Sequence, residues 1–192
     1  DLVYANNIWV AVGSVTNGDM VSTTDLAVWS RNSITTSDSD GIMPSFYGVD
    51  YGNGLFVAVG CSGNCSDIWE DSTGEIYTSE NGVNWTEATS SASFDCRNDH
   101  KVTTFDNKLW IVAGGKISGC SGSSTLVSDA WYSTDGANWT QATSPGFSAR
   151  RGHALVVFDS KMWVIGGYDG SSKFNDVWST SDGSNWTQVT SS

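Results

Sequence analysis

The sequence is poor in positive charge and in long apolar segments. Nine Lys and Arg residues stand against 21 Asp and Glu residues, which gives a formal net charge of -12 at pH 7. Such a molecule repels phosphate backbones and anionic lipid surfaces. No apolar run approaches the ~20 residues that a membrane helix requires, and no basic and apolar secretion leader precedes Asp1. We therefore expect neither nucleic-acid binding nor membrane insertion, and either a processed mature protein or an excised fragment.

Cysteine is also scarce. The four cysteines fall within one span, and no second pair of Cys or His residues completes a tetrahedral zinc site. Disulfides are therefore favoured over a metal, and no cofactor is expected. Disulfide bonds indicate an oxidising, extracellular setting. Four cysteines allow three pairings, of which we favour the one between neighbours in the sequence: Cys61–Cys65 with Cys96–Cys120.

Residues that favour turns are abundant. The chain has 21 Gly, together with many Ser, Thr, Asn and Asp residues, all of which favour turns over helix interiors. Its 192 residues include 10 Trp, so the chain is long enough and has enough large side chains for one buried core. The composition predicts a single all-β domain over residues 1–192.

Two phrases recur along the chain with a period of about 50 residues. The first is an aromatic residue, two turn residues and an apolar run that ends in glycine, as in FDSKMWVIGG (158–167). The second leads to a tryptophan and, in three of its occurrences, passes through a turn, as in SDAWYSTDGANWT (128–140). The phrases divide the chain into four units, approximately 1–45, 46–94, 95–147 and 148–192.

Each unit is interpreted as four short strands. In the last unit the strands are expected at residues 153–159, 162–167, 176–181 and 185–190. The Asp-Gly turn between the last two suits a tight hairpin because its residues tolerate positive φ. The second strand is apolar almost throughout, which indicates that both its faces are buried. Antiparallel four-stranded sheets repeated with this period predict a β-propeller of four blades.

Three features shared by the last two units resemble kelch repeats. They are a glycine pair after the second strand, an aromatic residue in the third strand and R-x-x-H before the first strand: Gly114–Gly115 and Gly166–Gly167, Trp131 and Trp178, Arg97 to His100 and Arg150 to His153. The turn phrase S/T-x-D-G-x-x-W resembles the Asp-box of sialidase-like propellers, although it is one residue shorter. These families commonly have six or seven blades. Four blades therefore imply either a small closed ring or part of a larger assembly, completed by further chain or a second subunit.

The first unit departs most from the pattern. It lacks the D-G-x-x-W ending, and residues 38–41, Asp-Ser-Asp-Gly, are the candidate remnant of the turn. In the other units we expect Asp135 and Asp182 to accept hydrogen bonds from their own turns, and the following tryptophans to be buried between blades. A feature repeated once per blade is structural rather than catalytic. The tryptophans concerned are Trp85, Trp139 and Trp186.

Four N-x-S/T sequences are candidate glycosylation sites: Asn64, Asn84, Asn138 and Asn185. Three of them occupy equivalent positions in the turn phrase. The alternative is that Asn simply favours the turn and Thr the strand that follows. Occupancy would also require a eukaryotic secretory host.

Cationic residues cluster before the first strands of the last two units. They are Arg97 with His100, and Arg150 and Arg151 with His153. Side chains at the start of an innermost strand point toward the propeller axis and its mouth, where these could hold a carboxylate or a sulfate. The resemblance to kelch repeats implies instead that they brace adjoining loops, and we favour this interpretation.

The loops after the second strands are expected to form one face, where binding residues concentrate on a rigid scaffold. Within them Trp69 matches no blade position. It is the candidate for stacking on a sugar ring or anchoring a protein partner. The alternative is a small satellite core beneath the loop.

The two resemblances also suggest enzymes that the residues do not support. A sialidase-like site requires an arginine triad and a Tyr/Glu pair, and a kelch-type copper oxidase requires several histidines, whereas the chain has two. The leading hypothesis is a non-enzymatic, secreted or cell-surface propeller that binds a glycan or a protein through its loop face. The alternative is a structural subunit of an extracellular filament, sheath or adhesin. A fragment of a sialidase-like enzyme is the least favoured.

Overall fold

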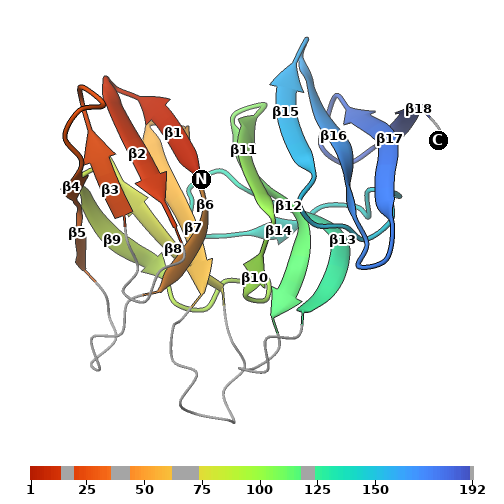
Figure 1. The fold of residues 1–192 in the computed structure, drawn as a ribbon, viewed down its shortest axis with the longest axis horizontal. Helices are drawn as coiled ribbons and strands as arrows, with labels where there is room; N and C mark the ends of the chain where they lie inside the picture. Colours follow the sequence, from red (N-terminus) through yellow and green to blue (C-terminus); the bar gives the residue numbers. More distant parts are fainter. Residues whose placement is uncertain (14–19, 36–43, 62–73, 118–123, 191–192) are drawn as a thin grey trace.

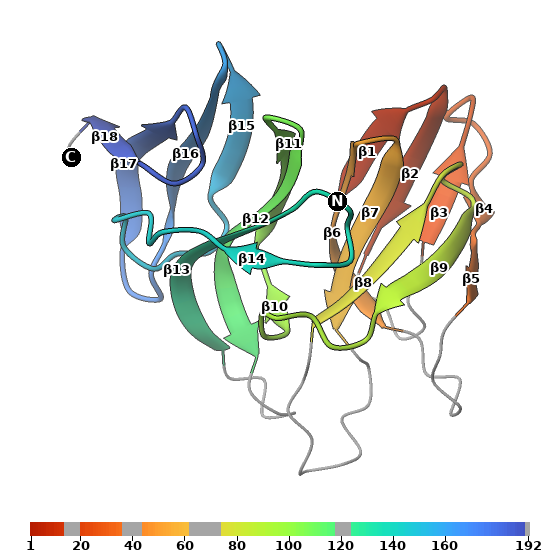
Figure 2. The same cartoon turned by 180° about the vertical axis from the view of Figure 1, so that it is seen from behind.

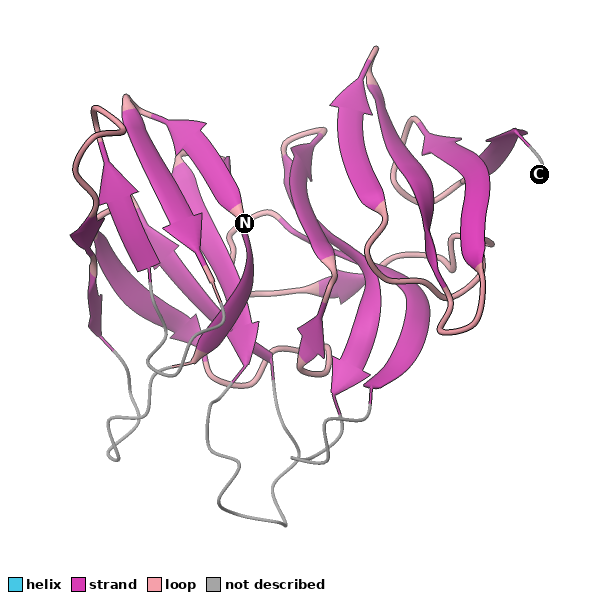
Figure 3. Ribbon diagram, in the orientation of Figure 1, coloured by secondary structure: helices cyan, strands magenta, loops and turns pink. Residues whose placement is uncertain are grey.

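The computed structural model describes residues 1–13, 20–35, 44–61, 74–117 and 124–190. Every element among these residues is a β-strand, and turns and loops join the strands (Figure 3). The strands form four sheets that follow one another in an arc around a common axis, so the fold is a four-bladed β-propeller (Figure 1). The predicted fold class is confirmed.

Blades 1 and 2 fill the first half of the chain. Blade 1 consists of β1 (Leu2–Ala5), β2 (Ile8–Val12), β3 (Met20–Thr23) and β4 (Ser30–Arg31), in that order across the sheet. Blade 2 consists of β6 (Ser45–Gly52), β7 (Leu55–Cys61), β8 (Gly74–Ser79) and β9 (Asn84–Thr89), with β5 (Ser33–Thr35) added beside β9. The pair β5–β9 is parallel, so the end of the first predicted unit joins the sheet of the second.

Blades 3 and 4 fill the second half. Blade 3 consists of β10 (Arg97–Asn98) and β11 (Lys101–Phe105), which both pair with β12 (Lys108–Ile117), then β13 (Ser124–Ser133) and β14 (Thr140–Gln141). Blade 4 consists of β15 (Ala154–Phe158), β16 (Lys161–Tyr168), β17 (Lys173–Thr180) and β18 (Thr187–Thr190). The strands of blade 4 agree with the four segments predicted for the last unit. Seen from the front and from behind, blades 1 and 4 lie at opposite sides of the molecule (Figures 1 and 2).

The turn of blade 1 corrects the prediction for the first unit. Residues 38–41 lie outside the described residues, and the turn that matches the other blades is at Asp25. Its carboxylate Oδ1 accepts hydrogen bonds from the hydroxyl of Thr23 at 2.9 Å and from the backbone N–H of Ala27 at 2.9 Å. Leu26 follows with φ of 62°, where the other blades have glycine. The sequence comparison missed this turn because it required glycine after the acidic residue.

The core is divided into three clusters, and each lies between consecutive blades: 1 and 2, 2 and 3, 3 and 4. Alternate residues of the second strands meet there; Val57 of blade 2, for example, shares a cluster with Leu109 of blade 3. The second strands of blades 2 and 3 are buried on both faces, which explains their nearly continuous apolar sequence. For β16 of blade 4 the prediction is wrong on one face, where Ile165 is 43% exposed. The residues that the structure describes form no corresponding cluster between blades 4 and 1.

The disulfide bond joins Cys61 to Cys96, so the favoured pairing of Cys61 with Cys65 and Cys96 with Cys120 is wrong. Cys61 is the last residue of β7, and Cys96 precedes β10 in the segment that enters blade 3. The fold brings these two segments together across the sequence, with Cα atoms 5.2 Å apart. Cys65 and Cys120 lie outside the described residues.

We predict that replacing both Cys61 and Cys96 with alanine lowers the free energy of unfolding by about 3 kcal/mol. The bond closes a sequence separation of 35 residues, and its loss frees the unfolded chain over that loop. Urea denaturation of the variant and the parent measures the difference. Equal midpoints would show that this bond does not constrain the unfolded chain.

Candidate functional site

Two arginines predicted as ligand-binding residues form ion pairs with aspartates inside the protein. Arg97 is 1% exposed and donates to both carboxylate oxygens of Asp129, at 2.7 and 3.1 Å. Arg150 is fully buried and donates to both oxygens of Asp176, at 2.7 and 2.9 Å. Both guanidinium groups therefore brace their blades, which agrees with the interpretation that the sequence favoured.

Each ion pair belongs to a repeated assembly that we call the clamp: the arginine, its aspartate and the tryptophan two residues after the aspartate. The indole N–H of Trp178 donates to Asp176 at 2.8 Å, and Trp131 makes the same bond to Asp129 at 2.8 Å. The hydrogen bonds from Arg150 hold the pKa of the Asp176 carboxyl below its ordinary value. The aspartates were not predicted from the sequence. The spacing D-x-W, present in both units, was the available signal.

The two histidines are also buried. His100 Nδ1 lies 3.1 Å from the carbonyl oxygen of Arg97, and His100 Nε2 has no hydrogen-bond partner among the described residues. Neither ring nitrogen of His153 has a partner within that part of the chain. Burial, followed by the charge of the neighbouring arginine, lowers the pKa of His100 to about 3 and that of His153 to about 4. Both rings are therefore neutral at pH 7.

Arg151 differs from the other predicted cationic residues because it is only half-buried. Its guanidinium carbon lies 5.7 Å from the ring centroid of Tyr168. Backbone hydrogen bonds join the same two residues, at 3.1 and 3.0 Å. Among the described residues the guanidinium makes no hydrogen bond or ion pair. The structure thus presents one uncommitted arginine on an aromatic ring.

Two hollows meet at Arg151. One, of about 400 Å³, is lined by β13 residues and by the turn between β16 and β17; the other, of about 470 Å³, extends over the ends of those two strands. Both lie on the side of the propeller where second strands lead into third strands, which is the loop face predicted from the sequence. Their described lining residues are Ser124, Leu126, Asp169, Gly170, Asp99, Gly152, Gly167, Tyr168, Lys173 and Phe174, in addition to Arg151.

Trp69, the predicted aromatic anchor of this face, and Asn64 lie outside the described residues. Four of the six predicted ligand-binding residues are committed inside the blades: Arg97 and Arg150 pair with aspartates, and His100 and His153 are buried neutral rings. Tyr168 and Lys173 were not predicted as site residues. Sequence alone gave no signal for them, because the contact between Tyr168 and Arg151 is recognised only when the two segments are paired.

The acidic turn residues act as predicted. Asp135 Oδ1 accepts from the backbone N–H groups of Ala137 and Asn138 at 2.9 and 2.8 Å, and Asp182 is bonded in the same way in blade 4. The bonds from Asn138 lower the pKa of Asp135 to about 2. Trp85 and Trp139 are buried between blades. These groups stabilise turns and interfaces.

The three candidate glycosylation sites in this turn phrase are exposed. The side-chain amides of Asn138 and Asn185 each donate to the aspartate of their turn at 2.7 Å. In the turn before Asn84, Asn81 occupies the position that aspartate holds in the other two turns. Glycans at these positions would extend from the surface, and their presence stays a prediction.

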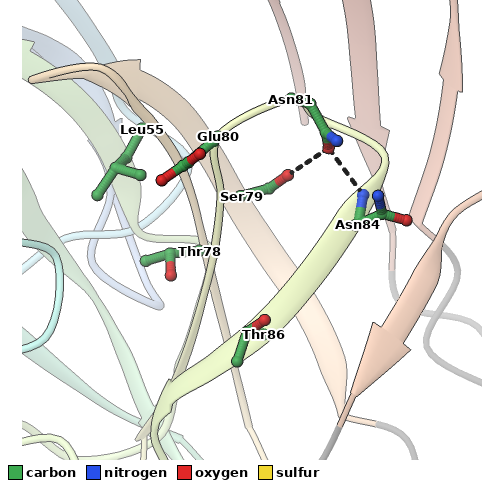
Figure 4. Close-up of a pocket in the computed structure, with 7 residues that line it drawn as sticks. All are labelled: Leu55, Thr78, Ser79, Glu80, Asn81, Asn84 and Thr86. Carbon is green, nitrogen blue, oxygen red and sulfur yellow. Dashed lines mark hydrogen bonds between the residues drawn. The ribbon is translucent and has the colours of Figure 1, made fainter.

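A separate polar hollow of about 320 Å³ lies on blade 2 (Figure 4). The hydroxyl of Ser79 and the backbone N–H of Asn84 both donate to Asn81 Oδ1 beside it. Thr78, which lines it, occupies the third-strand position that Tyr132 fills in blade 3. Its described lining residues, which include no aromatic or cationic side chain, are Leu55, Thr78, Ser79, Glu80, Asn81, Asn84 and Thr86.

The described residues include no group of three or more His, Cys, Asp or Glu side chains arranged to hold a metal ion. Nor does that part of the chain contain a helix long and apolar enough to cross a membrane.

Comparison with known families gives one match. The Kelch motif matches residues 149–179, which contain Arg150, Asp176 and Trp178 of the second clamp. This match and the four-blade arrangement support a kelch-repeat propeller, a class that generally mediates interactions between proteins. A search of curated proteins finds no match to the chain.

Proposed function

We propose that the protein is a non-enzymatic, extracellular binding module that recognises a protein partner through its loop face, at Arg151. The observation that carries this proposal is the uncommitted guanidinium of Arg151, held on the Tyr168 ring between two hollows. Arginine and tyrosine are the residue types that most often dominate binding energy at protein interfaces. The kelch-type fold supports a protein partner as well.

The chemistry of this site favours a carboxylate on the partner. A guanidinium presents parallel N–H donors that match the two oxygens of a carboxylate. Lys173 lines one of the two hollows and adds a second positive charge, whereas Asp99 and Asp169 also line them and oppose the binding of a highly charged anion. The ring of Tyr168 and the side chain of Leu126 offer apolar surface beside them. The fitting partner segment therefore combines an acidic residue with an apolar one.

Binding rather than catalysis agrees with the protonation and burial of the remaining residues. The histidines are buried and neutral, so they are poor acid or base groups for a substrate at the surface. Arg97 and Arg150 are committed to Asp129 and Asp176. The extracellular assignment is supported by the Cys61–Cys96 disulfide, since such bonds persist in oxidising compartments.

We predict that Arg151→Gln weakens the binding of acidic peptides by about tenfold or more, because a charge-assisted hydrogen bond contributes about 1.5–3 kcal/mol. A displayed random peptide library, panned against the immobilised chain, provides ligands, and calorimetry measures their affinity for both forms. Lys161→Gln is the matched control, since Lys161 lies at the opposite end of β16 from Tyr168.

The selected peptides are expected to contain Asp or Glu next to an apolar residue, and the control variant is expected to bind them unchanged. A glycan array tested in parallel separates the other class of ligand. Binding to glycans alone, or peptide binding that survives Arg151→Gln, would contradict the proposal.

A further inference from the structure

Among the described residues, the outer faces of blades 1 and 4 have no neighbouring blade packed on them. On blade 4, alternate residues of the first two strands pack toward blade 3, where Met162 and Val164 are fully buried. The intervening residues point to the other side of the sheet, and strand pairing places them together. We call this surface the blade 4 end face; it consists of Ala154, Val156, Phe158, Trp163 and Ile165. The exposed fractions are 44% for Val156, 70% for Phe158 and 43% for Ile165.

Blade 3 shows what covers such a face. Trp110 pairs with Tyr132, and Trp163 pairs with Ser179, so the two tryptophans occupy the same position in their sheets. Trp110 is completely buried, because the turn of blade 4 lies directly on it. A Cβ atom added to Gly183 in that turn would lie 2.0 Å from the Trp110 ring. Glycine is therefore required wherever a turn packs on a tryptophan at this position.

The free side of blade 1 is the side that, in the later blades, packs on the preceding blade. Trp29 corresponds to the buried tryptophans that follow the turns in later blades, yet it is 39% exposed, against 1% for Trp85 and 6% for Trp139. Those tryptophans are buried because each packs toward the preceding blade. Leu26, 54% exposed, occupies the turn position that is Gly82 in blade 2. This surface, the blade 1 end face, thus presents a turn with a large side chain.

The two end faces do not fit one another. If blade 1 packed on blade 4 as blade 4 packs on blade 3, Leu26 would lie on Trp163, at the place where even a single added carbon collides with Trp110. This holds for closure within one chain and for head-to-tail association of two copies. A heterologous contact of this kind requires complementary surfaces, and the two end faces are not complementary.

We propose that the blade 4 end face is the docking surface for a propeller blade of a partner, one that carries glycine in the turn between its third and fourth strands and tryptophan three residues later. The turn glycine would lie on Trp163 as Gly183 lies on Trp110, and the tryptophan would cover the apolar residues of β15 and β16. Because Leu26 occupies the glycine position, a second copy of this chain is excluded as that partner. This surface is distinct from the Arg151 site.

The first test extends the full chain with an appended second copy of residues 148–192, which brings a blade with the required glycine. In the appended copy Phe158 and Trp163 are replaced with leucine, so that only the original residues are measured. Oxidative footprinting followed by mass spectrometry measures the reactivity of Trp163 and Phe158. Both are expected to lose reactivity several-fold relative to the chain alone. The matched control carries leucine instead of glycine at the turn of the appended blade only, and is expected to leave both residues reactive. Equal protection by both appended blades, or by neither, would overturn the proposal.

The second test needs no added blade. Sedimentation of the unmodified chain is expected to show no association that depends on Trp29, while footprinting finds Trp163 reactive. Leu26→Gly removes the obstruction and is expected to produce head-to-tail oligomers, which Trp163→Glu in the same chain abolishes. If the unmodified chain forms oligomers that Trp29→Ala dissociates, or if Trp163 is protected in the monomer, the end faces bind one another and the proposal fails.

Discussion

Replacing Asp176 with alanine is expected to lower the free energy of unfolding by about 3–5 kcal/mol, because it leaves a buried charge without its partner. Arg150 is fully buried and directs two hydrogen bonds, at 2.7 and 2.9 Å, to the carboxylate that would be lost. The indole N–H of Trp178 would lose its acceptor too. Urea denaturation, followed by tryptophan fluorescence, measures the change.

An exposed ion pair provides the matched control. Lys116 and Asp95 lie 2.8 Å apart, but their side chains are 38% and 50% exposed, so Asp95→Ala is expected to cost less than about 1 kcal/mol. Replacing both Arg150 and Asp176 with apolar residues should recover most of the loss, since no unpaired charge then remains. A similar loss in both alanine variants would show that burial does not determine the effect.

The fold could be predicted from the sequence because its signals repeat. The apolar second strand and the turn before tryptophan recur in each half of the chain. A strand that is ambiguous in one unit can therefore be assigned from the equivalent segment of another unit. Blade 1 shows the limit of this approach. Its turn is made by the carboxylate of Asp25, but Leu26 replaces glycine, so a motif that specifies glycine does not find it.

The disulfide and the clamps show why contacts were harder to predict than strands. Cys61 and Cys96 are distant in the sequence and meet only because one blade leads into the next. Arg97 and Arg150 were recognised as a repeated pair, but whether they face a ligand or an internal carboxylate depends on Asp129 and Asp176 in a different strand. The position of an arginine in the sequence does not reveal whether an internal carboxylate already neutralises its charge.

The end faces show that equivalent residues of repeated blades can differ in burial. Trp110 and Trp163 are the same residue type at the same position in consecutive blades, yet one is fully buried and the other belongs to an uncovered face. The sequence of a blade therefore determines what it can pack against, while the neighbouring blade determines whether it does. This distinction is why composition alone could not separate a closed ring from part of a larger assembly.

The second large effect is expected on acidification: stability should fall steeply as the pH drops from about 6.5 toward 4. His100 and His153 have pKa values lowered to about 3 and about 4 by burial and by the nearby charges of Arg97, Arg150 and Lys101. The unfolded chain, with ordinary histidine pKa values near 6.5, binds more protons in this range, so protonation favours unfolding. Each histidine contributes about 1.4 kcal/mol per pH unit, and its stabilisation is complete only above the unfolded pKa.

Replacing His153 with phenylalanine tests the assignment. The chain has two histidines, so this variant is expected to lose about half of the slope of unfolding free energy against pH between pH 4.5 and 6.5. Its stability at pH 8 should be unchanged or higher, because the variant removes two buried ring nitrogens that have no partner among the described residues. The turn carboxylates, whose pKa values are lowered, affect stability only at more acidic pH. An unchanged slope in the variant would show that His153 binds protons equally in the folded and unfolded chain, so that burial does not lower its pKa.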